Sequence, residues 1–197
     1  MKNKGILLII SGPSGSGKGT VIKEMLKLCP SLFLSVSATT RAPREGEVDG
    51  KHYFFYSKQQ FGDELASGNM LEHTDYCDNF YGTPRIPIEE ALNKGKDIIL
   101  EIECDGCFQV KEKMHDAVSI FVVAPSIEEL KRRLIGRGTE SAEVIEKRLA
   151  QAELEYALEE EYDHKIVNHE PTKAANEILN IIKTTKGKRN GNEQTCS

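Results

Sequence analysis

A glycine-rich turn between an apolar run and an amphipathic segment constrains this sequence more than any other feature. Residues 12–20 read Gly-Pro-Ser-Gly-Ser-Gly-Lys-Gly-Thr, with the apolar run 6–10 before them and the apolar-periodic segment 21–28 after them. Glycines let the backbone wrap an anion with its N–H groups pointing inward, and a helix start adds unpaired donors. Strand, turn and helix in this order form a Walker A motif, which predicts a site for the phosphates of a nucleotide.

The residue after the lysine departs from the strict motif. Gly19 stands where Ser or Thr is expected, and Thr20 follows it. Lys18 is predicted to reach the outer phosphates, while the hydroxyl beside a magnesium ion comes from either Thr20 or Ser16. The predicted phosphate-binding residues are Gly12, Pro13, Ser14, Gly15, Ser16, Gly17, Lys18, Gly19 and Thr20.

Length and charge narrow the class of protein. The 197 residues suit one domain, or one core with small insertions. The formal net charge of −5 argues against general nucleic-acid binding, which needs a basic face. The first apolar run is too short for a signal peptide or a membrane span, so we expect a cytoplasmic protein with no membrane partner. The oligomeric state stays open between monomer and homodimer.

Four apolar runs separated by helical patterns predict an α/β fold with a parallel sheet. These core strands are expected at residues 6–10, 97–103, 118–123 and 164–168. Ligands of such sheets bind at the carboxyl ends of the strands, where the Walker turn lies.

Two carboxylates end the second of these runs. Glu101 and Glu103 are separated by one residue, so along a strand both would point to the same side. They are interpreted as the second half of a nucleotide–magnesium site, and the alternative is a strand that surfaces into solvent. A long helix is expected from about 142 to 160, with its charged side chains on a solvated face.

The middle of the chain has a different character. Short strands at 33–37, 52–56 and 70–75, a helix at 57–67 and an aromatic turn at 79–83 indicate an insertion beside the main sheet. The loop at 38–50, between the first two of these strands, carries Arg41 and Arg44, whose guanidinium groups suit a phosphate.

These segments together resemble the guanylate kinase family over about residues 5–183. The resemblance rests on the Walker loop, the stretch 35–50, Asn79-Phe-Tyr-Gly82, Gly136-Arg-Gly-Thr-Glu140 and Ile166-Val-Asn168. It implies a P-loop NTPase-type parallel sheet flanked by helices, a mixed α/β GMP-binding insertion and a small helical lid. The implied boundaries are 1–34, 93–135 and 151–185 for the core, 35–92 for the insertion, 136–150 for the lid, and 186–197 for a tail expected to be disordered.

The resemblance also implies an activity, namely transfer of the γ-phosphoryl group of ATP to GMP, and to dGMP, with Mg²⁺. The catalytic residues that it implies are Lys18, Arg133, Arg137 and Arg148, with Asn168 beside the adenine. The implied GMP-binding residues are Ser37, Arg41, Arg44, Tyr53 and Tyr81 at the phosphate, Glu72 and Thr83 at the guanine, and Glu101 and Glu103 near the base or ribose. The alternative is a catalytically silent module of the same fold that binds a protein partner; the competent Walker loop and the lid arginines favour the enzyme.

Overall fold

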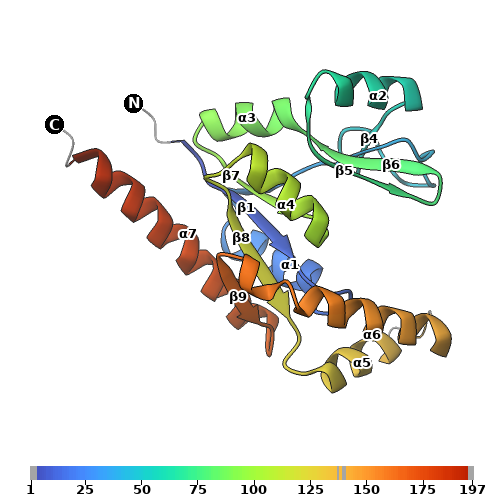
Figure 1. The fold of residues 1–197 in the computed structure, drawn as a ribbon. Helices are drawn as coiled ribbons and strands as arrows, with labels where there is room; N and C mark the ends of the chain where they lie inside the picture. The colour runs from blue at the N-terminus through green and yellow to red at the C-terminus, as the bar shows by residue number, and fades with distance from the viewer. Residues whose placement is uncertain (1–3, 137, 139–140, 195–197) are drawn as a thin grey trace.

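A five-stranded parallel sheet forms the centre of the molecule (Figure 1). The structure, a computed structural model, describes residues 4–136, 138 and 141–194. The sheet has the order β2-β7-β1-β8-β9, with β1 at Leu7–Ser11, β2 at Leu32–Leu34, β7 at Asp97–Glu101, β8 at Val118–Val123 and β9 at His164–Val167. The four predicted core strands are present, and β2 adds an edge strand that the sequence did not place in this sheet.

Alternate residues of β1 point into two separate apolar cores, one on each face of the sheet. Leu8 and Ile10 pack with α1 (Lys18–Leu28) and α7 (Pro171–Gln194). Leu7 and Ile9 pack with α3 (Arg85–Asn93) and α4 (Cys104–Lys113) on the other face. A strand buried on both faces must be apolar at every position, which explains the continuous run at 6–10. The predicted fold class is confirmed.

The insertion is a second, four-stranded sheet in the order β4-β3-β6-β5. Its elements are β3 at Ala38–Thr39, β4 at Phe54–Phe55, α2 at Lys58–Ala66, β5 at Met70–Tyr76 and β6 at Asn79–Pro84. The Ser57 hydroxyl accepts a hydrogen bond of 3.0 Å from the Gln60 N–H and so caps α2, as its sequence predicts. In Figure 1 this sheet and α2 lie beyond α3 and α4, away from α7.

The expected aromatic turn at 79–83 is wrong, because these residues form most of β6. The hairpin turn lies just before them, at Cys77 and Asp78, whose φ angles are 47° and 60°. Two consecutive left-handed residues match the twist of paired strands, so this short turn can join β5 to β6 directly. The resulting register places Glu72 opposite Thr83.

Two helices cover the carboxyl end of the sheet. α5 runs from Ile127 to Gly136 and α6 from Ala142 to Tyr156, and they pack through Leu130, Leu134, Ile145 and Ala152. A short 3₁₀ turn, η1, at Glu159–Glu161 then leads into β9. The helix expected to run to about 160 thus ends at Tyr156. Arg137 lies outside the described residues.

The expected disordered tail is wrong for residues 186–194, because α7 continues to Gln194. The side chain of Lys186 donates a hydrogen bond of 2.7 Å to Asp97 Oδ2, at the start of β7. This contact joins residues far apart in the sequence, so no local pattern could reveal it. None of the described helices is long and apolar enough to cross a membrane.

Replacing Asp97 with alanine is expected to lower the free energy of unfolding by about 1–3 kcal/mol. Its Oδ1 accepts a buried hydrogen bond of 3.0 Å from the Ile6 N–H, which would otherwise stay unpaired. Urea unfolding of Asp97→Ala measures the loss. The matched control, Lys186→Met, removes only a partly exposed ion pair and is expected to cost about 1 kcal/mol or less. Equal losses for the two variants would contradict the role given to the buried hydrogen bond.

Candidate active site

The Walker turn packs directly against strand β8. Gly12, Gly15 and Gly17 have φ angles of 134°, 91° and 93°, which side chains with a Cβ rarely adopt. A Cβ on Gly12 would also lie 2.2 Å from the Val122 carbonyl oxygen. Gly17 is the N-cap of α1, so the first N–H groups of this helix face the turn. The predicted order of strand, turn and helix is present.

Lys18 is folded back over the turn. Its Nζ donates hydrogen bonds to the carbonyl oxygens of Gly12 and Pro13, the second at 3.2 Å. The same side chain lines the large cavity described below. Its ammonium group therefore lies between the Walker turn, which is called the phosphate turn below, and that cavity.

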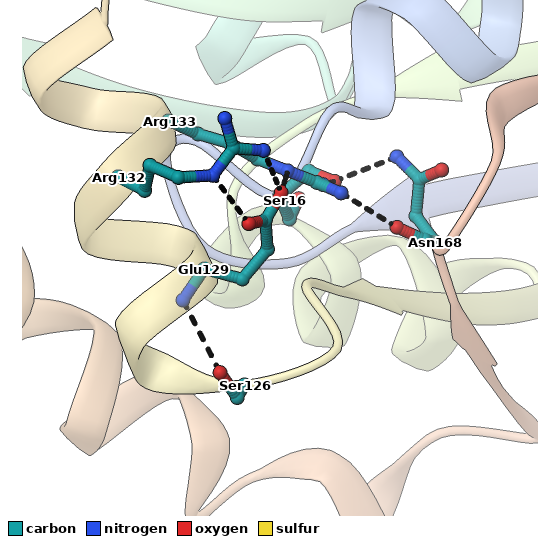
Figure 2. Close-up of polar contacts among 6 residues, drawn as sticks. All are labelled: Ser16, Ser126, Glu129, Arg132, Arg133 and Asn168. Carbon is teal, nitrogen blue, oxygen red and sulfur yellow. Dashed lines mark hydrogen bonds and ion pairs between the residues drawn. The ribbon is translucent and has the colours of Figure 1, made fainter.

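Two side chains fix the turn from outside (Figure 2). Arg133 on α5 donates from Nη1 to the Ser16 carbonyl oxygen at 3.0 Å and from Nη2 to that of Asn168 at 2.8 Å. Asn168 is buried, and its Nδ2 donates to the same Ser16 oxygen at 2.8 Å. The turn is thus tied to α5 and to the end of β9. The sequence predicted contacts with nucleotide for both side chains and did not anticipate these contacts with the turn.

Arginines of α5 and α6 are held by an acidic and a hydroxyl partner. Glu129 accepts from Arg133 Nε at 2.8 Å and also pairs with Arg132, and these hydrogen bonds lower the pKa of its carboxyl to about 2. On α6, Arg148 donates from Nη1 to the Ser14 hydroxyl at 2.5 Å. Both α5 and α6 therefore contribute a guanidinium group to the phosphate turn.

A cavity of about 770 Å³ lies between the core sheet, the insertion and α6. Of the predicted site residues, the structure places seven in its lining, namely Lys18, Ser37, Tyr53, Glu72, Tyr81, Glu101 and Glu103. The lining also includes Gln151, Leu154 and Glu155 from α6, which sequence reasoning missed. Their residue types in a charged helix gave no signal of a site.

Glu72 and Thr83 form a buried pair at the insertion end of the cavity. The Thr83 hydroxyl donates a hydrogen bond of 2.6 Å to Glu72 Oε1. Both side chains are buried, and a Cβ on Gly106 of α4 would lie 3.2 Å from Glu72 Oε2. Burial raises the pKa of the Glu72 carboxyl, while the Thr83 hydrogen bond and the charge of Lys113 act in the opposite direction.

The two loop arginines share one carboxylate. Arg41 Nη2 lies 2.9 Å from Glu47 Oε1, and the Arg44 backbone N–H donates to Glu47 Oε2 at 2.7 Å. The hydrogen bond from Arg41 is the main cause that lowers the pKa of Glu47 to about 2. The Arg41 guanidinium also lies 5.5 Å from the ring centre of Tyr53. Arg41 therefore contacts a residue of the cavity lining. Arg44 is exposed and does not line the cavity.

The strand that was expected to run to residue 103 is shorter than predicted. β7 ends at Glu101, and Glu103 is already the N-cap residue of α4, because the chain turns into this helix earlier than expected. Both acids nevertheless line the cavity. Burial raises the pKa of Glu101, and the nearby charge of Lys18 opposes that shift.

Comparison with known proteins finds relatives over nearly the whole chain. The family model described as guanylate kinase matches residues 4–185. The guanylate kinase of Clostridioides difficile (strain 630) is 51% identical over 185 residues, which cover 94% of this chain and 90% of the relative. That of Lactiplantibacillus plantarum is 50% identical over 187 residues, covering 94% and 91%. A crystal structure of guanylate kinase from Anaplasma phagocytophilum matches with a TM-score of 0.72 at 36% identity, covering 93% of this chain and 87% of that chain.

Glu72→Gln is expected to gain stability relative to the unchanged protein as the pH rises. Burial raises the folded-state pKa of Glu72, so the folded protein holds a proton more tightly than the unfolded chain and loses stability as that proton leaves. The glutamine side chain does not lose a proton in this pH range, so its stability contribution does not change with pH. Urea unfolding of both proteins between about pH 4 and pH 7.5 measures the difference, which should be smallest at the acid end. A difference that does not change with pH would contradict this account.

Proposed function

This chain belongs to the guanylate kinase family, and on that premise we propose how its residues carry out the reaction. The protein is an ATP:GMP phosphotransferase, which moves the γ-phosphoryl group of ATP to GMP and releases ADP and GDP. The alternative of a catalytically silent protein-binding module is not favoured, since the relatives that match over nearly the full length are named enzymes.

One observation supports the proposed site most strongly. A single cavity connects Lys18 of the phosphate turn with the buried Glu72 of the insertion. A nucleoside monophosphate bound in this cavity has its base near Glu72 and its phosphate toward Tyr53 and Tyr81. Such a pose directs the acceptor phosphate to the turn that holds the donor, which is the alignment that phosphoryl transfer requires.

We assign the donor nucleotide to the Walker turn, residues 12–20. Backbone N–H groups of the turn and of the α1 start would bind its phosphates, and Lys18 would exchange two carbonyl partners for phosphate oxygens. The buried Asn168 Oδ1 has no hydrogen-bond partner in the described part of the chain, and we assign it to accept from the amino group of adenine. Arg133 and Arg148 already contact the turn, and Arg137 is assigned to the same charge-neutralising group.

We assign the acceptor base to Glu72 and Thr83. The two carboxylate oxygens of Glu72 would accept from guanine N1–H and the 2-amino group, while the hydrogen bond from Thr83 fixes the orientation of the carboxylate. Adenine offers no such pair of donors and would leave a buried carboxylate unpaired. Sites of this kind discriminate by roughly 10⁴-fold or more.

We assign the acceptor phosphate to the hydroxyl and guanidinium groups at the insertion side of the cavity. Ser37, Tyr53 and Tyr81 line the cavity, and Arg41 lies beside Tyr53. Arg44, which does not line the cavity, is assigned with them because its backbone N–H shares Glu47 with Arg41. Guanidinium forks and hydroxyls together match the oxygens of a phosphate dianion. Arg41 is bound to the Ala42 carbonyl oxygen and to Glu47, and it would exchange Glu47 for the phosphate.

The chemistry needs no covalent help from the protein. An oxygen of the GMP phosphate attacks the γ-phosphorus of ATP while the bond from that phosphorus to the bridging oxygen of ADP breaks. The attacking group is already ionised at neutral pH, so no general base is required. Lys18 and the arginines reduce the repulsion between the two sets of phosphates, and the cavity aligns them.

Mg²⁺ is the proposed cofactor, and the residues at the start of α1 fit it. The exposed Thr20 carries a hydroxyl there, and Glu101 Oε1 would lie 3.6 Å from a Cβ on Gly19. Hydroxyl and carboxylate oxygens are hard ligands that suit Mg²⁺, whose other ligands in such sites are phosphates and water. When bound, the ion supplies positive charge to the phosphates. Thr20 would hold it directly or through water; the alternative is Ser16, whose buried hydroxyl has no partner among the described residues.

A coupled assay of ADP formation with GMP, IMP and AMP tests the assignment of the base. GMP is expected to be the best substrate. IMP, which keeps N1–H but lacks the 2-amino group, should be intermediate, and AMP should be poorer than GMP by roughly 10⁴-fold in kcat/KM. Equal use of AMP and GMP would refute the role assigned to Glu72.

Lys18→Met is expected to keep the fold and the binding of GMP while kcat falls by about 10²–10³-fold. The lysine charge lies beside the donor turn, not beside the guanine pair. Initial rates give kcat, and calorimetry gives GMP affinity. The exposed Lys23 on the same helix provides the control Lys23→Met, which should change neither quantity. A Lys18→Met protein with near-normal kcat would show that the lysine assignment is wrong.

A further inference from the structure

Glu155 of α6 is a buried carboxylate that the assignments above do not use. Its side chain lines the large cavity, yet the residue is only 8% exposed. Oε1 accepts a hydrogen bond of 3.2 Å from Gln151 Nε2, one turn earlier on the helix. Oε2 is buried and has no hydrogen-bond partner in the part of the chain that the structure describes. A buried carboxylate oxygen without a donor is costly, so its retention at a cavity wall needs an explanation.

The surroundings of Glu155 make the missing donor more significant. Burial is the main cause that raises the pKa of Glu155. The negative charges of Glu103 and Asp105 raise it further, and the positive charge of Lys18 lowers it. Glu103 and Asp105 line the same cavity across from α6. The described protein groups around the carboxylate are thus mainly further acceptors. A ligand in the cavity is the natural source of a donor.

The acceptor nucleotide has few hydrogen-bond donors to offer. On the proposed function, Glu72 takes guanine N1–H and the 2-amino group, and the ionised phosphate carries no donor. The second N–H of the 2-amino group and the hydroxyl groups of the ribose remain, and the ribose hydroxyls are the ones farther from Glu72. Glu72 stands on β5 of the insertion and Glu155 on α6, so the two carboxylates approach the cavity from different elements. The ribose lies between the base and the phosphate, so it is the part of the nucleotide that can donate a hydrogen bond to Glu155.

We propose that Glu155 binds the ribose of the acceptor nucleotide, with its unpaired oxygen accepting a hydrogen bond from the 2′-hydroxyl. Gln151 occupies the other oxygen, so one hydroxyl is bound and not both. Turning the unpaired oxygen toward that hydroxyl removes the cost of its burial without a partner. Glu155 is thereby a specificity-determining residue that favours GMP over dGMP, and this assignment rests on the proposed function.

The test compares kcat/KM for GMP and dGMP in the unchanged protein, Glu155→Met and Glu155→Gln. A hydrogen bond to a charged group is worth about 1.5–3 kcal/mol, so the GMP preference lost in Glu155→Met is expected to be about 10- to 100-fold. Glu155→Gln keeps a neutral acceptor and should lose less. It also provides the readout if the methionine variant fails to fold. The loss should appear mainly in KM for GMP.

Glu153→Met is the matched control, since Glu153 lies on the exposed side of the same helix and should keep the substrate ratio unchanged. If Glu155 had only a structural role, its replacement would lower kcat/KM for GMP and dGMP by the same factor. An unchanged ratio of the two values would overturn the proposal. An unchanged protein that uses GMP and dGMP equally would overturn it too, as would a selective loss with 3′-deoxy-GMP in place of dGMP. If the unchanged protein phosphorylates no guanine nucleotide, the proposed function itself fails.

Discussion

The contact of the phosphate turn with strand β8 is the constraint on which the rest of the structure depends. Gly12 approaches the Val122 carbonyl so closely that no side chain fits between them. The turn can then adopt its left-handed conformation and present α1 and Lys18 toward the carboxyl edge of the sheet. Arg133 and Asn168 complete this arrangement by binding the Ser16 carbonyl from two other elements. Because three elements fix one turn, the site that we propose for the donor phosphates would be largely formed before a nucleotide binds.

The cavity that we propose for the acceptor nucleotide follows a different principle, because it is lined by several buried carboxylates. Burial raises the pKa of each of the three carboxyls Glu72, Glu101 and Glu155, so the folded chain bears a cost for keeping them charged. Hydrogen-bond donors of a nucleotide can offset that cost. The loop arginines are kept near the cavity by Glu47, which the incoming phosphate would replace. On the proposed function, the burial of these carboxylates lowers stability and raises selectivity for one ligand.

Local patterns were enough to predict the Walker turn, the helix that begins after Ser57 and the central strands, because each depends on residues close together in sequence. They were not enough for β6, whose aromatic and glycine residues look like a turn until they pair with β5. The end of α7 depends on Asp97, which belongs to another strand. Glu155 resembled one more solvated acid of a charged helix, and only the packing of α6 on the core shows that it is buried. Glu47 lies three residues after Arg44, and this short spacing was a local hint that the two residues are in contact.

Calorimetric titration of the unchanged protein with GMP, and separately with AMP, tests the central claim that a buried carboxylate in one cavity recognises guanine. The account predicts a single GMP site per chain and affinity for AMP weaker by at least about 10²-fold, since adenine leaves Glu72 without its donors. Binding of AMP as tight as that of GMP, or no binding of GMP, would contradict it.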